Sequence, residues 1–186
     1  MDTCLVKFRD VYKYDVKKAY NFEINKGDCV LISGENGQGK TTLTKLILGY
    51  IRPDQGLIEK KHMQIGYLPE HISFPWFMKV NRYLERLSMI KQSKAYDQYI
   101  YLFEIPLFKT IYELSKGNRQ KLGIISACIG KPDMIILDEP LSTLDEKGRE
   151  QFYDMIASIK NEEQAVIIIT HFPSFLKPLC NKHIAL

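Results

Sequence analysis

The stretch 34–41 carries the residues whose types and spacing are best suited to chemistry. It reads GENGQGKT and fits the phosphate-binding pattern G-x-x-x-x-G-K-[ST]. Glycines let the backbone curl so that several N–H groups point into one concavity, and a helix that follows adds partial positive charge. In such a loop we expect Lys40 to reach the β- and γ-phosphates of a nucleotide, and the Thr41 hydroxyl to bind Mg²⁺.

The segments on both sides of this loop agree with that interpretation. An apolar, strand-like run covers 29–32, and a helix-like run covers 40–48. The motif requires a strand before it and a helix after it. We therefore expect most residues of the loop and of the first helical turn to contact the nucleotide. They are Gly34, Asn36, Gly37, Gln38, Gly39, Lys40, Thr41 and Thr42.

A second candidate site is the pair of acids at the end of the apolar run 134–137. An apolar run of this kind predicts a buried parallel strand, which places Asp138 at the carboxyl edge of the sheet, where open α/β sheets bind ligands. Asp138 is expected to hold Mg²⁺, directly or through water, and Glu139 to act as general base toward the attacking water. The alternative is two acids that cap a turn before Pro140.

Composition limits the remaining classes of function. The chain has 186 residues, 45% of them hydrophobic, which fits one domain with a small inserted subdomain. A net charge of +4 without a clustered basic stripe argues against a nucleic-acid partner. The four cysteines match no metal-binding spacing, and Cys29 and Cys128 lie in apolar runs typical of buried thiols in a reducing compartment. The first ten residues lack the apolar region of a secretory signal, and the apolar runs are of strand length, so we expect a cytoplasmic protein.

Strands and helices alternate along most of the chain. Strands are predicted at 4–11, 19–24, 29–32, 57–59, 64–68, 134–137 and 165–170, with a final strand at 183–186. Helices are predicted at 40–48, 117–129 and 146–160, with a last helix from Pro173. The segment 79–108 has helical spacing, many tyrosines and no glycine, and is interpreted as a small helical insert. This alternation predicts a parallel sheet covered on both faces.

Further motifs occur in a fixed order around these elements. They are YLPE at 67–70, LSKGN at 114–118, LSTLD at 141–145 and His171 after the strand 165–170, with Tyr14 near the N-terminus. With these motifs the chain resembles the nucleotide-binding domain of ATP-binding-cassette transporters over nearly its full length. The resemblance implies an α/β fold: a P-loop NTPase core with a mainly parallel sheet, an N-terminal antiparallel β subdomain and an inserted helical subdomain. In that scheme 1–70 and 131–186 form the core, and 71–130 form the helical subdomain.

The resemblance also implies roles for single residues, with ATP and Mg²⁺ as cofactors. Glu139 and His171 are the expected catalytic residues, and Glu70 joins Thr41 and Asp138 as a metal ligand. Two further groups of contacts are expected. Ser115 and Gly117 face the γ-phosphate bound by a second subunit, and Tyr14, with Tyr12 as its rival, stacks on adenine.

Asp145 is expected to link the two sites of the dimer, unless it only caps the helix that follows; both roles are compatible.

The chain departs from the family pattern in several places. Glu70 replaces the usual glutamine, which brings a negative charge close to the phosphates. In the signature, Lys116 and Asn118 replace glycine and glutamine, while Ser115 and Gly117 remain. The chain ends soon after His171, from which we expect few further elements and an open sheet edge.

An aromatic cluster, Phe74, Trp76 and Phe77, follows the YLPE motif. Three interpretations remain open: the core of the helical insert, an exposed docking surface, or a mixture of both. The resemblance places the groove that receives a helix of the membrane subunit beside this segment.

These expectations combine into one function. The chain is expected to be an ATPase subunit that forms a head-to-tail dimer, with itself or with a related subunit, around two ATP molecules. It would act at the cytoplasmic face of the membrane and drive a separate membrane subunit, and the form of the signature favours export by analogy. The rival functions are a soluble cassette ATPase that acts on nucleic acid or ribosomes, and a nucleotide sensor without catalysis.

Overall fold

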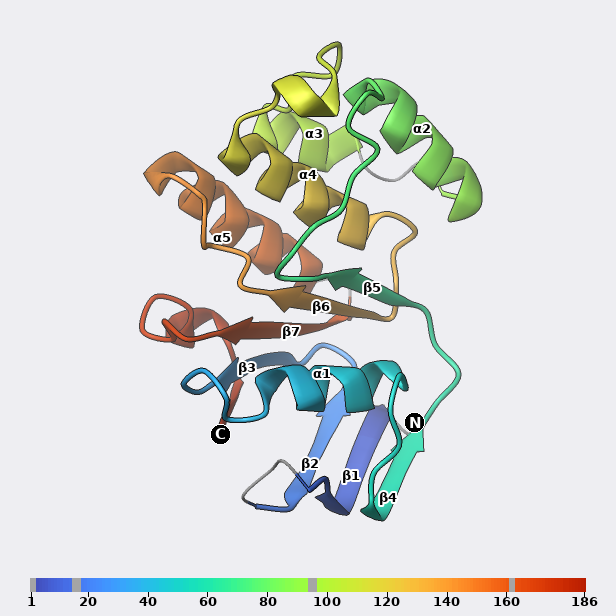
Figure 1. Ribbon diagram of the computed structural model, residues 1–186, viewed down its shortest axis with the longest axis vertical. Coiled ribbons are helices and arrows are strands. Elements are labelled where there is room, and N and C mark those ends of the chain that lie inside the picture. The colour runs from blue at the N-terminus through green and yellow to red at the C-terminus, as the bar shows by residue number, and fades with distance from the viewer. Residues whose placement is uncertain (1–2, 15–17, 94–96, 161–162) are drawn as a thin grey trace.

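Two β-sheets and five α-helices make up the computed structural model, which describes residues 3–14, 18–93, 97–160 and 163–186. Five parallel strands form the larger sheet in the order β5-β6-β7-β3-β8, and three antiparallel strands form the smaller sheet in the order β2-β1-β4 (Figure 1). The strands are β1 Cys4–Tyr12, β2 Tyr20–Asn25, β3 Cys29–Ser33, β4 Gln55–Lys60, β5 Ile65–Leu68, β6 Met134–Asp138, β7 Ala165–Thr170 and β8 Lys182–Ala185. The helices are α1 Lys40–Leu48, α2 Val80–Ile90, α3 Asp97–Phe103, α4 Lys116–Cys128 and α5 Glu146–Lys160, with two short 3₁₀ helices, η1 Ile111–Glu113 and η2 Lys177–Leu179.

The central strands of the parallel sheet are apolar because both of their faces are buried. In β3, Cys29 and Leu31 belong to the core shared with the helices α2 to α5, whereas Val30 and Ile32 belong to the core shared with α1 and the antiparallel sheet. The parallel sheet therefore separates two cores. Strand β3 packs against both cores, and the phosphate loop follows directly after it.

Helix α1 lies between the parallel and the antiparallel sheet (Figure 1). Its apolar side, Leu43, Leu46 and Ile47, is buried in the core between them. Glycines in the left-handed region bound it at each end, Gly39 with φ 95° and Gly49 with φ 79°. A side chain at either position would be strained, so the sequence fixes where the helix begins and ends.

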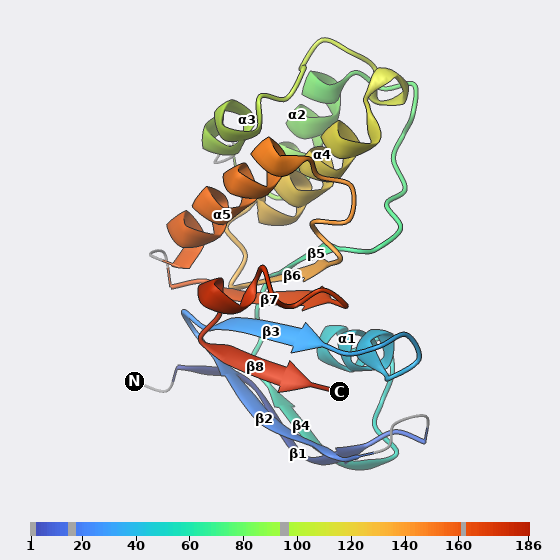
Figure 2. The same cartoon turned by 90° about the vertical axis from the view of Figure 1, so that its left-hand side faces the viewer.

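The helices α2 to α5 cover the opposite face of the parallel sheet (Figures 1 and 2). Helix α4 approaches the sheet most closely at β5, where a Cβ on Gly66 would lie 1.9 Å from the carbonyl oxygen of Ala127. Gly66 therefore allows backbone-to-backbone contact between α4 and the sheet. This contact fixes α4 against the strands that end at the candidate site.

Most of the predicted fold is confirmed. The mainly parallel sheet, the N-terminal antiparallel sheet and the helical character of 79–108 are all present; residues 94–96 of that segment lie outside the described ranges. The helix predicted from Pro173 is wrong, because only the short 3₁₀ helix η2 forms there. An α-helix through this segment would contain Pro178, which has no N–H to donate and whose ring would clash with the preceding turn. Within the part of the chain that the structure describes, no helix combines the length and apolar character needed to cross a membrane.

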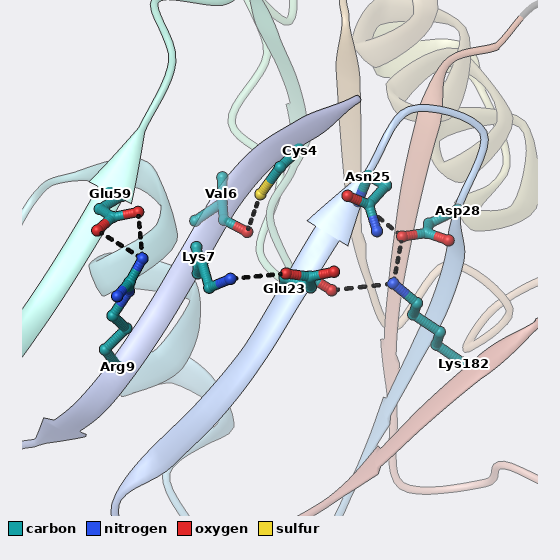
Figure 3. Close-up of polar contacts among 9 residues, drawn as sticks. All are labelled: Cys4, Val6, Lys7, Arg9, Glu23, Asn25, Asp28, Glu59 and Lys182. Atoms are coloured by element: carbon teal, nitrogen blue, oxygen red, sulfur yellow. Dashed lines mark hydrogen bonds and ion pairs between the residues drawn. The ribbon is translucent and has the colours of Figure 1, made fainter. Parts of the chain in front are cut away.

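Ion pairs on the exposed side of the antiparallel sheet join neighbouring strands (Figure 3). Lys7 pairs with Glu23 across β1 and β2 at 3.1 Å, and the Lys182 ammonium on β8 donates to the Glu23 carbonyl at 3.1 Å and to Asp28 Oδ2 at 2.7 Å. Exposed pairs contribute little to stability. The half-buried Lys182 contacts nevertheless connect the edge strand β8 to the antiparallel sheet.

Candidate active site

The phosphate loop begins where β3 ends and closes where α1 starts. Gly37 and Gly39 have φ of 83° and 95°, which only glycine adopts readily. The ammonium group of Lys40 donates to the carbonyl oxygens of Gly34 and Glu35 at 2.7 and 3.0 Å. The Lys40 side chain therefore extends back across the loop, and its ammonium group lies over the backbone of the loop.

A cavity of about 300 Å³ lies beside this loop, and four separate segments of the chain line it. The lining residues are Asn36, Gly37, Gly39, Lys40, Thr41, Thr42, Glu70, Asp138, Glu139 and His171. A neighbouring cavity of about 430 Å³ is lined by Gly34 and Gln38 together with Asn36 and His171. The fold thus brings nearly all of the predicted phosphate, metal and catalytic residues to one place.

The acid pair lies at the end of β6. Asp138 and Glu139 are each only 8% exposed. Glu139 has φ 49°, a left-handed conformation that is uncommon for a residue with a side chain, and its N–H donates to the carbonyl of Ile169 on β7 at 2.9 Å. Strain of this kind is found most often at functional sites, where surrounding contacts hold it in place.

Three donors at the end of β7 hold the carboxylate of Glu139. The Thr170 hydroxyl donates to Oε2 at 3.0 Å, and the N–H of His171 donates to Oε1 at 2.9 Å. The His171 ring nitrogen Nδ1 lies 2.6 Å from the same Oε1. These contacts fix the carboxylate, and both Glu139 and the partly exposed side chain of His171 line the cavity.

Asp138 combines burial with neighbouring negative charge. The pKa of Asp138 is raised from 3.8 to about 6, mainly by burial and then by the carboxylates of Glu70 and Glu139, against the opposing charges of Lys40 and His71. A divalent cation bound here would offset the desolvated charge.

The donors fit Mg²⁺, which prefers hard oxygen ligands. The Thr41 hydroxyl and the carboxylates of Asp138 and Glu70 line the same cavity. Among the residues that the structure describes, no three His, Cys, Asp or Glu side chains are grouped to hold a metal ion by themselves. One hydroxyl and two carboxylates suit Mg²⁺, because this ion commonly binds one or two carboxylates and completes its coordination with phosphate and water.

The signature segment lies away from this cavity. Ser115 is the N-cap of α4, and its hydroxyl accepts the N–H of Asn118 at 3.1 Å. Ser115 is exposed, and Gly117 packs against the carbonyl of Thr143 rather than against the phosphate loop. The structure therefore does not bring Ser115 and Gly117 to the cavity of their own chain.

Two other expected residues are also outside the cavity. Tyr14 is 79% exposed, and its N–H donates to Asp54 Oδ2 at 3.0 Å; its rival Tyr12 is half-buried at the end of β1. Asp145 accepts the N–H of Gly148 at 2.8 Å, which is the N-cap arrangement for α5. The stacking role and the dimer role of these residues stay predictions.

Sequence reasoning missed two residues that hold Glu139. Thr170 bonds the carboxylate of Glu139, and the buried amide of Gln120 on α4 donates to the carbonyl oxygens of Glu139 and Pro140, both at 3.2 Å. Thr170 directly precedes His171, so its position was an available signal. Nothing local signals Gln120, because its contact depends on how α4 packs on β6.

Comparison with known proteins identifies the family. A family model described as ABC transporter matches residues 17–142, which is more than half of the chain. The chain belongs to the ABC transporter family. Its part in that family is the ATP-binding domain.

A curated relative in the ABC transporter family is the zinc import ATP-binding protein ZnuC of Wigglesworthia glossinidia brevipalpis. It is 33% identical over 181 residues, which cover 90% of this chain and 76% of ZnuC. The first curated relatives are longer proteins, and the chain spans from 62% to 76% of their length. The expectation of export has no support here, because this relative is named for import.

Solved ABC transporter structures show the same fold. The ATP-binding subunit of an ABC transporter superposes with a TM-score of 0.86 at 24% identity, over 98% of this chain and 85% of that one. The dimeric ABC transporter cassette MJ0796 superposes with a TM-score of 0.81 at 20% identity, over 98% of this chain and 94% of that one. At these identities the likeness concerns the fold alone.

Proposed function

We propose that this chain binds ATP with Mg²⁺ in the cavity beside the phosphate loop and hydrolyses it, as the ATP-binding subunit that drives a separate membrane subunit at the cytoplasmic face of the membrane. The observation that carries the proposal is the composition of that cavity. Phosphate-loop glycines, Lys40, the Asp138–Glu139 pair and His171 line it together. A nucleotide sensor without catalysis would not need an oriented acid beside the phosphate site.

The proposed division of labour follows from the contacts. Lys40 and the N–H groups of the loop neutralise the β- and γ-phosphates. Thr41, Asp138 and Glu70 hold Mg²⁺, which supplies charge stabilisation to the phosphates when bound. Glu139, held by Thr170 and by the backbone N–H of His171, accepts the proton of the attacking water, and the His171 ring, in the same cavity, contacts the γ-phosphate.

The position of the signature supports a head-to-tail dimer. Ser115 and Gly117 do not line the cavity of their own chain, yet they lie at the first turn of a long helix, where N–H groups and partial positive charge suit an anion. We propose that they contact the γ-phosphate bound by a second cassette, either a copy of this chain or a related subunit. Two ATP molecules would then be enclosed between the two cassettes.

The membrane subunit is proposed to dock beside the aromatic cluster of the segment 71–130, which we take as the helical subdomain. The structure fits the mixed interpretation: Phe74 is buried and packs edge-on against Trp76 and Tyr83, whereas Phe77 is 94% exposed. Trp76 is partly exposed, with the guanidinium of Arg119 5.3 Å from its ring. Phe77 is therefore the aromatic side chain available to a partner.

Glu139→Gln tests the proposed function. Glutamine keeps the size of the side chain but cannot accept a proton, so ATP binding should persist while turnover falls on the order of 10²-fold or more. Binding is measured by titration with ATP and Mg²⁺, and turnover by phosphate release from the purified protein. Near-normal turnover in Glu139→Gln would remove this residue from its role, and absence of turnover in the wild-type dimer would favour the sensor instead.

Phe77→Ala tests the docking surface. The readout is the yield of the multi-spanning membrane protein that co-purifies with the tagged wild-type chain from its host. Tyr50→Ala is a matched control, because Tyr50 is a similarly exposed aromatic residue at the end of α1. Loss of the membrane protein in Phe77→Ala alone is expected, and full yield in both variants would show that the cluster does not dock it.

A further inference from the structure

A pair of thiols lies outside the active site. Cys29 is the first residue of β3, and Cys180 lies just before β8. The sulfur atoms of Cys29 and Cys180 are 3.1 Å apart, although 151 positions separate the two residues in the chain. A covalent disulfide has a sulfur–sulfur distance of about 2.05 Å. The two side chains are thus thiols in direct contact, about 1 Å farther apart than a bond requires.

Backbone contacts hold this pair together without help from the sulfurs. The N–H of Cys29 donates to the side chain of Asn181 at 2.7 Å, and the N–H of Asn181 donates to the carbonyl of Cys29 at 3.0 Å. The Asn181 amide and the Lys182 ammonium both contact Asp28, the latter as drawn in Figure 3. The neighbours Asp28 and Asn181 are therefore held next to the two cysteines, and the sulfurs need to approach each other by about 1 Å to bond.

The two thiols differ in exposure. Cys29 is completely buried, whereas Cys180 is partly exposed, so a small oxidant reaches Cys180 first. The other cysteines have different surroundings. Cys128 is buried at the end of α4, where burial raises the pKa of its thiol to about 12, and Cys4 on β1 donates to the carbonyl of Val6. Neither of these descriptions includes a partly exposed thiol in contact with a buried one, as at Cys180 and Cys29.

We propose that Cys29 and Cys180 are a modification site at which a hydroperoxide forms a reversible disulfide that fastens β8 to β3. In the first step the sulfur of Cys180 attacks the peroxide, the O–O bond breaks, the alcohol or water leaves, and Cys180 becomes a sulfenic acid. In the second step the sulfur of Cys29 attacks the sulfur of Cys180, and the hydroxyl leaves as water with the thiol proton. Two thiols and one hydroperoxide thus give one disulfide, one alcohol and one water.

The bond would act on the edge strand β8. Strand β8 pairs only with β3 in the described sheet, and the chain reaches it through the irregular segment that follows His171. A bond from Cys29 to Cys180 joins positions 151 apart and closes a loop that includes the five described α-helices and the strands β4 to β7. Closing so long a loop restricts the unfolded chain, and we expect the thermal unfolding midpoint to rise by about 5 °C or more.

The test is peptide mapping of the folded wild-type protein after graded treatment with hydrogen peroxide, digested without reductant. The expected product is one cross-linked pair of peptides containing Cys29 and Cys180, lighter by two hydrogens and restored by dithiothreitol. Cys29→Ala should leave Cys180 as a sulfenic acid that a dione probe traps, and Cys4→Ala should leave the cross-link unchanged. The thermal midpoint is compared between wild type and Cys180→Ala after the same peroxide treatment.

Several results would overturn the proposal. One is that peroxide oxidises methionines or Cys4 while the peptides with Cys29 and Cys180 stay separate. This measurement needs only the wild-type protein, so it remains valid even if a variant fails to fold. Another is a cross-link that appears only at temperatures where the protein unfolds. A cross-link that forms without any rise in the midpoint would refute the fastening of β8. None of these readouts depends on ATP turnover, so they are independent of the proposed function.

Discussion

Replacing Thr170 by valine removes one of the three donors that hold the catalytic carboxylate. The Thr170 hydroxyl, which is buried, donates to Glu139 Oε2 at 3.0 Å, while His171 contacts only Oε1. Valine has nearly the same shape as threonine and is equally suited to a strand, so β7 should form as before. The substitution therefore tests the orientation of the acid rather than the fold.

The size of the effect follows from the hydrogen bond that is lost. A bond to an ionised acceptor contributes about 1.5–3 kcal/mol. If that energy holds Glu139 in the position from which it accepts the proton, kcat should fall by about 10- to 100-fold, since about 1.4 kcal/mol corresponds to a factor of ten. The affinity for ATP should stay within about threefold, because Thr170 does not line the cavity beside the phosphate loop.

The assay is steady-state phosphate release by the purified protein, with ATP affinity measured by equilibrium titration. Thr170→Ser is the matched control, because it keeps the hydroxyl and should retain most of the activity. Thermal unfolding of both variants shows whether β7 is intact; the Thr170 hydroxyl also accepts the N–H of Phe172 at 3.1 Å, so a small loss of stability is expected in Thr170→Val. Equal kcat in Thr170→Val and wild type would refute the assignment of Thr170 as a positioning residue.

Three further predictions use other contacts. Lys40→Ala should weaken ATP binding by about tenfold or more in an equilibrium titration, because it removes the charge that lies over the phosphate loop. Asp138→Asn should stabilise the metal-free protein, because the raised pKa of Asp138, about 6, means that folding disfavours the ionised carboxylate. This destabilisation is absent below about pH 4 and complete above about pH 6; the pKa shift corresponds to roughly 3 kcal/mol, which solvent screening lowers to about 1–2 kcal/mol. The gain in the free energy of unfolding should therefore appear in urea unfolding at pH 8 with a chelator and be smaller at pH 5. His183→Ala should cost about 1 kcal/mol in the same urea assay, because it removes the 2.7 Å hydrogen bond between His183 on β8 and the Ser33 hydroxyl before the phosphate loop; Ser33→Ala should cost about as much and the double variant no more than either.

The phosphate loop could be predicted because all of its determinants are local. Glycines at the strained positions, a lysine at the first helical turn and an apolar strand before it lie within 29–48. The acid pair could be predicted for the same reason, since an apolar run ends directly at Asp138. Neither required knowledge of which strands are neighbours in the sheet.

The donors to Glu139 could not be derived in that way. Thr170 and His171 reach this carboxylate because β6 and β7 pair in parallel, with Asp138 opposite Ile169. Strand order and register are properties of the folded sheet, and periodicity in the sequence does not specify them. His171 was recognised only through its family resemblance, and Thr170 beside it was therefore missed.

Helix α4 connects the signature to the catalytic acid of the same chain. Ser115 caps its N-terminus, and Gln120, about one turn further along, donates to the carbonyls of Glu139 and Pro140. The Thr143 hydroxyl lies 3.5 Å from the carbonyl of Lys116, so the loop after the acid also contacts the first turn of α4. Any force on the signature from a second cassette would thus reach Glu139 through one helix and two hydrogen bonds. In the proposed dimer, a partner's phosphate bound at the signature would therefore have a direct structural route through α4 to Glu139.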